Sequence, residues 1–186
     1  MTAAKRNTAR EASGYILGRV ARMLDGNGAP IEEAVRMIAS EKRVFVYGVG
    51  RSGLVARAFA MRLVQLGLDA FFIGETITPI VKSGDLVVIV SNTGTTMSAV
   101  QTANIARREG AKVLAVTGST HSKLAQAANL ALIISEGKDG KRARYAPLST
   151  LFETAALVLL DGIVAQVMEV LVENEASMRR RHAIMV

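Results

Sequence analysis

The sequence predicts an α/β protein, a three-layer αβα sandwich built on a five-stranded parallel sheet of the flavodoxin-like or Rossmann-like kind. Apolar runs rich in β-branched residues alternate with helical stretches along most of the chain. These runs are apolar throughout, which is typical of parallel strands covered on both faces. The length of 186 residues, half of them hydrophobic, indicates one domain over 1–186. Its expected parts are N-terminal helices at 1–40, a sheet core at 41–135, and a C-terminal helix and tail at 148–186.

Two helices are expected before the sheet. Residues 9–24 place apolar side chains on one helical face: Ile16, Val20, Met23 and Leu24. The stretch GNGAP then breaks the pattern, and Pro30 suits the first turn of a second helix. That helix continues through the amphipathic stretch at 31–41.

Strands and helices alternate in the middle of the chain. Strands are expected at 43–49, 69–74, 84–90, 111–118 and 129–135. Helices between them are expected at 52–67, 95–110 and about 121–128. Residues 136–147 are expected to form a loop, and a long helix to run from about 150 to 175. Because that helix is apolar on nearly every side, we expect it to be buried by more than its own sheet, in an oligomer.

Composition narrows the possible partners and cofactors. The chain has no cysteine, and its two histidines, His121 and His182, are far apart, so we expect no transition-metal centre. A net charge of +7 favours an acidic partner, yet aromatic residues make up only 4% and no zinc-finger or RNP motif occurs. We therefore expect no nucleic-acid partner. Two explanations of the positive charge remain open: a small phosphorylated substrate, or a basic surface that is only solvated.

The N-terminal stretch is polar and lacks the apolar core of a signal peptide. The most apolar window, at 154–172, is interrupted by Asp161, Gln166 and Glu169, so it falls short of the roughly 18 uninterrupted apolar residues that favour a membrane span. The sequence therefore predicts a cytoplasmic protein with no membrane partner.

The first glycine-rich loop has the GxGxxG spacing of a dinucleotide site. Gly48, Gly50 and Gly53 follow an apolar run and lead into a helical pattern. Glu75 lies 22 residues after Gly53, where it is placed to accept a hydrogen bond from a ribose hydroxyl. An NAD-dependent oxidoreductase is therefore one hypothesis.

A second loop, SNTGTT at 91–96, follows the third strand. Four of its six side chains carry hydroxyls, and it precedes a helix. Hydroxyls and free backbone N–H groups at a helix N-terminus bind phosphate monoesters, although such residues also serve simply as helix caps. A dinucleotide site needs only the first loop. The two loops together therefore favour a site for a phosphate monoester.

The loop SNTGTT resembles the Ser-x-Ser/Thr-Gly-x-Thr phosphosugar loop of the sugar isomerase (SIS) domain family. The resemblance runs from Val46 to Ala183 and is strongest to the 6-phospho-3-hexuloisomerases. Four more stretches carry it: GVGRSGLVARAFAMRL, AVTGSTHSKLA, RYAPLSTLFE and NEASMRRRHA. Asn92 stands where that loop usually has Gly, and Thr95 where it usually has Glu. The C-terminal IMV lacks the usual acidic ending. The resemblance implies the SIS fold. It also implies four phosphate ligands in the two loops: Ser52, Ser91, Thr93 and Thr96.

The resemblance also implies conversion of D-arabino-hex-3-ulose 6-phosphate to fructose 6-phosphate through a 2,3-enediol, with no cofactor. Glu153 is then the candidate base, although TLFE also reads as a capping box with Thr150 as the cap. His182 is the candidate proton relay, against the alternative of a surface histidine.

Further substrate contacts are expected from Gly50, Arg51, Asn92 and Arg181. Arg51 is alternatively solvated, and Arg181 is alternatively a salt-bridge partner. The resemblance implies a homo-oligomer, a tetramer, whose C-terminal tail contributes to a neighbouring active site. Two other functions remain open: isomerisation of a pentose or heptose phosphate, and a non-catalytic regulatory module that binds a sugar phosphate.

Overall fold

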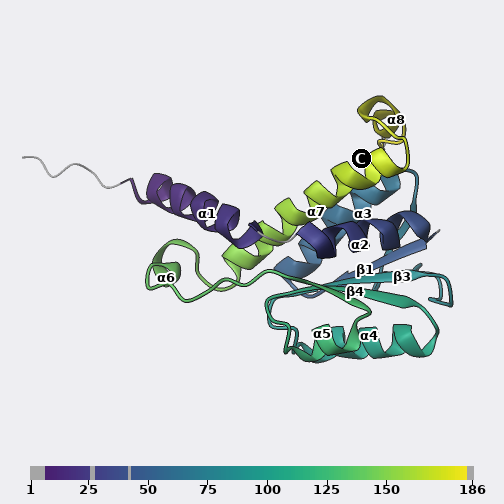
Figure 1. Cartoon of the computed structure of the whole chain (residues 1–186), viewed down its shortest axis with the longest axis horizontal. Coiled ribbons are helices and arrows are strands. Elements are labelled where there is room, and N and C mark those ends of the chain that lie inside the picture. The colour runs from purple at the N-terminus through teal and green to yellow at the C-terminus, as the bar shows by residue number, and fades with distance from the viewer. Residues whose placement is uncertain (1–6, 26–27, 42, 184–186) are drawn as a thin grey trace, which may run out of the picture.

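The computed structural model describes residues 7–25, 28–41 and 43–183, which form a five-stranded parallel sheet covered by helices (Figure 1). The strands are β1 (Arg43–Gly48), β2 (Asp69–Phe72), β3 (Leu86–Ser91), β4 (Lys112–Thr117) and β5 (Leu130–Ile133). Their order in the sheet is β2-β1-β3-β4-β5, and every pair is parallel. The α/β sandwich predicted from the sequence is confirmed. The C-terminal IMV and part of the GNGAP break lie outside the described residues.

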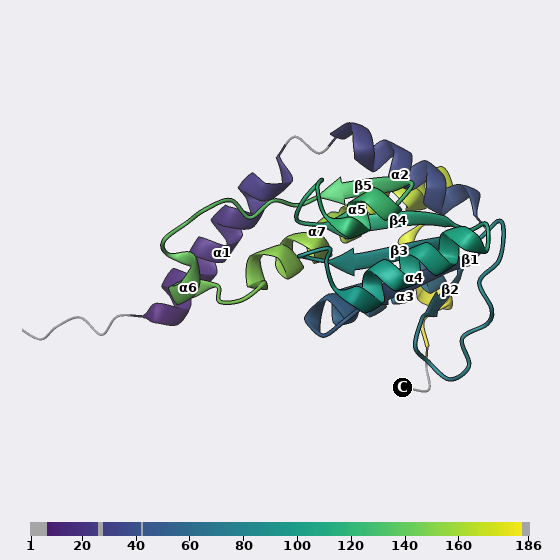
Figure 2. The same cartoon turned by 90° about the horizontal axis from the view of Figure 1, so that it is seen from below.

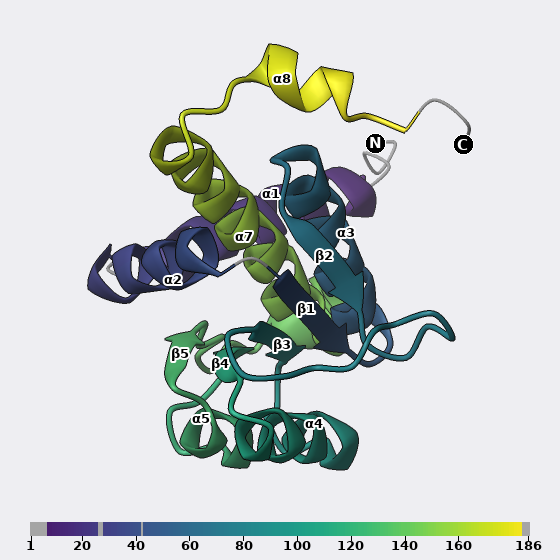
Figure 3. The same ribbon diagram turned by 90° about the vertical axis from the view of Figure 1, so that its right-hand side faces the viewer.

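Helices form a layer on each face of the sheet. One face carries α2 (Gly28–Ser40), α3 (Arg51–Gln65) and α7 (Thr150–Val170). The other carries α4 (Met97–Arg108) and α5 (Lys123–Ala127). Helix α1 (Thr8–Leu24) projects beyond the sheet and packs against α7 (Figure 1). The end-on view in Figure 3 shows α4 and α5 below the sheet, with α2, α3 and α7 above it. Two short helices, α6 (Arg142–Tyr145) and α8 (Glu175–Arg180), lie outside these layers.

The strands read as continuous apolar runs because both of their faces are buried. All six residues of β3 are buried. Val88 and Val90 face the core beneath α3 and α7, whereas Val87 and Ile89 face the core above α4. Alternate side chains of one strand therefore belong to different cores, so β3 is apolar on both faces as far as Ser91 at its end.

Two sequence expectations about helix boundaries are wrong. The stretch at 136–147, expected as a loop, contains α6, which packs beside α1 through the rings of Tyr15 and Tyr145, 5.6 Å apart (Figure 2). The long helix ends at Val170 instead of continuing to about 175. Asn174 caps α8 in a capping box with Ser177, and these bonds start a new helix in a new direction.

Helix α7 runs through the thicker helical layer. Of the helices in the described part of the chain, it alone is long and apolar enough to cross a membrane. Its most apolar window is 56% buried inside the protein. Its inward side chains join α1, α2 and α3 in one core, which is the environment of a core helix.

The topology places a crevice at the carboxyl ends of β1 and β3. The chain leaves β1 toward α3 on one face and leaves β3 toward α4 on the other. Adjacent strands whose connections diverge in this way leave an opening between their loops, where open α/β sheets bind ligands. The loop after β1 is GVGRSG, and the loop after β3 is SNTGTT.

Candidate active site

A small pocket of about 170 Å³ lies at this crevice. Loop residues after β1 and β3 and the first turn of α7 line it: Val49, Ser52, Val90, Ser91, Asn92, Thr93, Thr96, Ala99, Ser149 and Glu153. The structure thus brings together six residues that the sequence singles out, namely the four predicted phosphate ligands with Asn92 and Glu153. They are separated by up to a hundred residues in the chain and meet because parallel strands end at one edge.

The hydroxyl groups of the second loop are not used to cap α4. Thr96 is the N-cap residue, yet its side chain makes no capping hydrogen bond. Its hydroxyl lies 3.4 Å from that of Ser91, which is nearly buried at the end of β3. The alternative that these residues merely cap the helix is therefore wrong for Thr96. The hydroxyls and the first N–H groups of α4 are left for an anion.

The loop after β4 holds the second loop in shape. Gly94 has a φ of +58°, and a Cβ there would lie 2.4 Å from Ser122 Oγ and 2.6 Å from Thr117 Oγ1. The Gly118 N–H donates to the Asn92 carbonyl at 2.8 Å. A glycine at 94 is therefore required both by its backbone angle and by the close approach of these hydroxyls.

The first loop positions Ser52 and Arg51. Gly50, the N-cap residue of α3, has φ 59° and ψ −134°, which is a glycine conformation. A Cβ on Gly53 would lie 2.6 Å from the Gly48 carbonyl oxygen, so β1 and α3 pack backbone to backbone. This turn places Ser52 in the pocket wall and directs Arg51 toward α7.

Glu153 is the carboxylate of the pocket. Its residue is 8% exposed, and its Oε2 accepts a hydrogen bond from Arg51 Nε at 2.5 Å. The Arg51 side chain is 63% exposed, so the pair joins one buried group to one that solvent reaches. An ionised carboxylate near a helix N-terminus is also favoured by the helix dipole.

The capping-box interpretation of Glu153 is wrong. The N-cap residue of α7 is Ser149, one place earlier than expected, and its side chain makes no capping bond. The Thr150 hydroxyl instead donates to the Pro147 carbonyl at 2.7 Å. Glu153 therefore lies one position beyond the third helical residue, where it no longer reaches back to the cap.

A second carboxylate, Glu136, was missed by the sequence reasoning. It follows β5, and its Oε1 accepts from Asn92 Nδ2 at 3.2 Å and from the Phe152 N–H at 3.3 Å. Arg142 lies 3.4 Å from its Oε2. Glu136 thus supplies the cap that α7 lacks from its own N-cap side chain. The one available signal was its place directly after a parallel strand, at the edge where the pocket lies.

Ser149 was also missed, and it changes the interpretation of Asn92. Its Oγ accepts a hydrogen bond from Asn92 Nδ2 at 3.1 Å. The two amide hydrogens of Asn92 are thus directed at Ser149 and Glu136. Asn92 lines the pocket, as the prediction of a substrate contact requires. Both of its amide hydrogens, however, bond to protein side chains and not to a ligand.

The tail residues lie at the other end of the molecule. Arg181 donates to the Gln65 carbonyl at 3.2 Å, at the last turn of α3, whereas Arg51 at the first turn meets Glu153. A 15-residue α-helix is about 22 Å long. Within one chain, His182 and Glu153 therefore do not share a site. His182 is exposed beside a groove of about 330 Å³ that it lines with Met178.

Of the two alternatives for Arg181, a substrate contact or a salt-bridge partner, the second holds within this chain. Its guanidinium bonds both oxygens of Glu173, at 2.9 and 2.8 Å. Hydrogen bonds from Arg181 and then from Ser177 lower the pKa of Glu173 to about 2. The start of the tail is therefore fastened to the end of α3 by a charged cluster.

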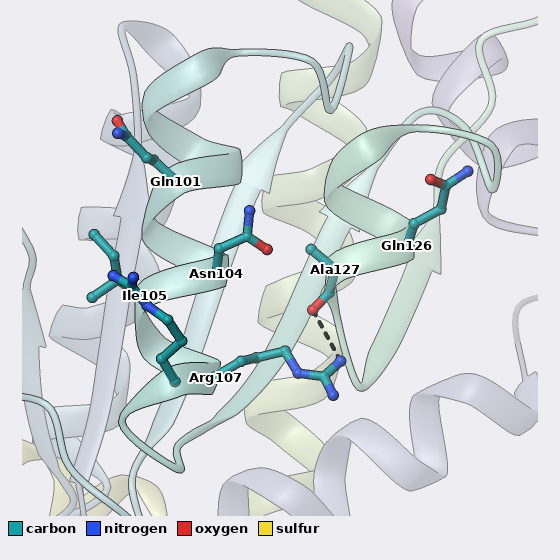
Figure 4. A pocket seen from close by; sticks show the side chains of 7 residues that line it. Gln101, Asn104, Ile105, Arg107, Gln126 and Ala127 are labelled. Carbon is teal, nitrogen blue, oxygen red and sulfur yellow. Dashed lines mark hydrogen bonds between the residues drawn. The ribbon is translucent and has the colours of Figure 1, made fainter.

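A larger pocket, of about 650 Å³, lies between α4 and α5. Figure 4 shows Gln101, Asn104 and Gln126 around it, with Arg107 donating to the Ala127 carbonyl at 3.3 Å. None of its lining residues is an acid or a histidine, so it offers no general base. The arginine bond also satisfies a carbonyl at the end of α5.

The acid that favoured a dinucleotide site is engaged elsewhere. Glu75 forms an ion pair with Arg57, and the Arg57 guanidinium lies 3.7 Å from the centre of the Phe72 ring. Glu75 is not part of the pocket lining. Among the described residues, no group of three or more His, Cys, Asp or Glu side chains is placed to hold a metal ion.

Comparison with known proteins gives a consistent result. The model of the SIS domain family matches residues 37–160. A protein of Methanocaldococcus jannaschii named 3-hexulose-6-phosphate isomerase is 33% identical over 152 residues, which cover 82% of each chain. A Bacillus subtilis protein of the same name is 35% identical and covers 78% of this chain and 81% of its own.

A solved structure is also similar over nearly the whole chain. It is a Methanococcus jannaschii protein whose crystal structure is described as inferring a molecular function of 3-hexulose-6-phosphate isomerase. The TM-score is 0.82 at 30% identity, with 94% of this chain and 97% of that chain covered.

Proposed function

This chain belongs to the SIS domain family, and from that premise we propose that it isomerises D-arabino-hex-3-ulose 6-phosphate to fructose 6-phosphate. The coarser activity, that of a phosphosugar isomerase, is common to the named relatives. The names of these relatives supply the hexulose phosphate of the finer proposal, and the pocket is the observation that carries the chemistry. A group of hydroxyls beside a helix N-terminus lies next to one nearly buried carboxylate.

The hydroxyls hold the phosphate. Ser91 and Thr96 lie at the end of β3 and the start of α4, and Ser52 and Thr93 complete the cradle. Their hydroxyls and the first N–H groups of α4 donate to the phosphate oxygens, and the dipole of α4 favours the dianion. This end of the substrate is thereby fixed, so the sugar carbons extend toward α7.

Glu153 is the base in this mechanism. Its carboxylate removes the proton from C2 of the 3-ketose, and the electron pair forms the C2–C3 double bond of an enediol as charge passes to O3. A proton reaches O3 and the O2–H proton leaves. Glu153 then returns its proton to C3, which leaves the carbonyl at C2. The exposed guanidinium of Arg51 turns from Glu153 to the oxygen that gains charge.

His182 moves the proton between O2 and O3, and it comes from a neighbouring chain. We propose a cytoplasmic homotetramer in which the tail of one chain reaches the pocket of another. Exposed apolar side chains on α3 and α7 supply a contact face, which includes Leu54, Met61, Val64 and Leu157. Leu54 and Leu157 border a groove of about 310 Å³ that also reaches Glu153. An apolar face of this kind is typical of subunit contacts.

NMR of the purified protein with fructose 6-phosphate in D2O tests the reaction. We expect a second set of signals from the 3-ketose, with deuterium entering the sugar at the carbons that exchange protons. Arabinose 5-phosphate serves as the control sugar, because it carries the phosphate but not the ketose.

Three outcomes would replace the proposal. Exchange and conversion of a pentose or heptose phosphate alone would assign another phosphosugar isomerase. Tight binding of fructose 6-phosphate without conversion would assign a regulatory module. Saturable binding of NAD, measured by titration, would restore the dinucleotide hypothesis for the GVGRSG loop.

A further inference from the structure

We propose that Glu136 and Asn92 are positioning residues that join the phosphate loop to the first turn of α7 and turn the Ser149 hydroxyl toward the substrate. The proposal rests on the proposed function, because it assigns Ser149 a part in the same reaction. Ser149 is then a further catalytic residue that donates a hydrogen bond to the sugar oxygen beside the carbon that Glu153 deprotonates.

Three separate segments meet at one carboxylate oxygen. Glu136 Oε1 accepts from Asn92 of the phosphate loop and from the Phe152 N–H of α7, at 3.2 and 3.3 Å. Asn92 Nδ2 also reaches Ser149 Oγ, the residue just before α7, at 3.1 Å. Glu136 therefore sets the distance between the phosphate loop and the helix that carries Glu153.

Glu136 is held in place by its own set of partners. Arg142 lies 3.4 Å from its second oxygen, and Arg19 of α1 donates to its backbone carbonyl. The side chain is mostly buried, so its hydrogen bonds are shielded from water. The N-terminus of α7 also favours a negative charge at this point. The carboxylate is thus fixed from both sides and does not depend on a ligand.

The direction of the Asn92 bond determines what Ser149 can do. Because Asn92 donates to Ser149 Oγ, the proton of that hydroxyl remains available for donation. The Ser149 side chain makes no capping bond, and it lines the same pocket as Glu153, one helical turn away. A donor at this place opposes the charge that gathers on the sugar oxygen as the enediol forms.

Substitutions at Glu136 test the link. Glu136→Ala removes the shared acceptor, and we expect kcat to fall about tenfold or more, because small displacements of catalytic groups are costly. Glu136→Gln keeps an acceptor oxygen, and we expect kcat within about threefold of the wild type. Lys138→Ala is the control, because Lys138 is an exposed residue of the same segment.

An exchange of donor and acceptor makes the test stricter. Asn92→Asp places a second carboxylate against Glu136, and we expect it to lower kcat more than Asn92→Ala does. The double variant Asn92→Asp with Glu136→Gln restores one donor and one acceptor in reversed order. The bond between positions 92 and 136 is thereby restored, so we expect Tm to recover relative to Asn92→Asp. We expect kcat to stay low, because the carboxylate at 92 accepts the Ser149 proton that Asn92 leaves free.

Ser149→Ala tests the hydroxyl itself. We expect kcat to fall by about tenfold with KM nearly unchanged, since the hydrogen bond strengthens only as charge develops. Thr154→Val is the control. Its hydroxyl donates to the Thr150 carbonyl on the same helix and does not line the pocket.

A measurement without turnover separates this proposal from the proposed function. A double-mutant cycle on Tm with Asn92→Ala and Glu136→Ala reports their coupling even in an inactive protein. Coupled losses of Tm, with no conversion of hexulose phosphate by the wild type, would leave the link standing and overturn the reaction. Additive losses, or equal kcat in Glu136→Ala and Lys138→Ala, would overturn the link. Full kcat in Ser149→Ala would remove Ser149 from the chemistry.

Discussion

The pocket at the carboxyl ends of β1 and β3 and the tail around α8 differ in what their polar groups do. In the pocket, the Ser91 and Thr96 hydroxyls contact each other, and neither caps α4. In the tail, Arg181 is held by Glu173, and Arg179 pairs with Glu175 at 2.8 Å. The first region leaves the Thr96 proton and the first N–H groups of α4 for a ligand, whereas the second uses its charges on itself. A reactive site is therefore recognised by groups left free at a strand edge, and a charged cluster by itself is not enough.

The largest expected effect tests the pocket. Glu153→Gln removes the base and should lower kcat by at least about 100-fold. Circular dichroism and Tm should stay close to the wild type, since the ion pair lost with Arg51 is largely exposed on the arginine side. Glu169→Gln, an exposed position on the same helix, is the control. Retained activity in Glu153→Gln would remove the base from this pocket.

The next effect tests whether the tail serves a neighbouring pocket. His182→Ala should lower kcat by about 10- to 100-fold as a lost proton relay. Mixing it with Glu153→Gln, after unfolding and refolding together, should recover about one quarter of the activity if each site takes the two residues from different chains. Absence of recovery would place both residues in one chain or exclude the tail.

A smaller effect concerns the apolar face that would join two chains. Met61→Asp puts a charge on α3 at a residue that is 50% exposed, about two helical turns from Leu54 at the border of the groove. We expect a smaller species in sedimentation, with fructose 6-phosphate binding kept and turnover reduced. Ile105→Asp, at a 45% exposed residue on α4, is the control. An unchanged assembly would exclude this face as the contact.

The smallest effect concerns the bond that fastens the tail. The pKa of Glu173 is about 2 in the folded chain against an ordinary 4.5, so its charge stabilises the folded tail above that ordinary value. The contribution is lost as pH falls from 4.5 toward about 2. Glu173→Gln should therefore lower hydrogen-exchange protection of α8 near neutral pH, and the difference from wild type should shrink in acid. Glu175→Gln should show no such trend, because its pair with Arg179 is exposed.

Most of the fold could be predicted from the sequence, since a parallel sheet buried on both faces requires apolar strands such as 86–90. The phosphate hydroxyls could be predicted for a related reason, because strand ends meet at one edge. Glu136 and Ser149 could not. Their contacts depend on the path of residues 136–149, which contains α6 and a left-handed Leu148 at φ 58°. The end of α7 was missed because the apolar pattern of the sequence continues beyond that end. The capping bonds of Asn174 instead start a separate helix, α8.

Helix α7 carries Glu153 in its first turn and leads into α8 at its other end, so its 21 residues act as a spacer between two functional regions. One inserted residue would turn the tail by about 100° relative to Glu153 and lengthen the spacer by about 1.5 Å. If neighbouring chains exchange tails, every pocket in the assembly would be disturbed by that one change. The length of α7 therefore constrains how the subunits fit together. Insertions in the surface loops should cost less activity than insertions in this helix.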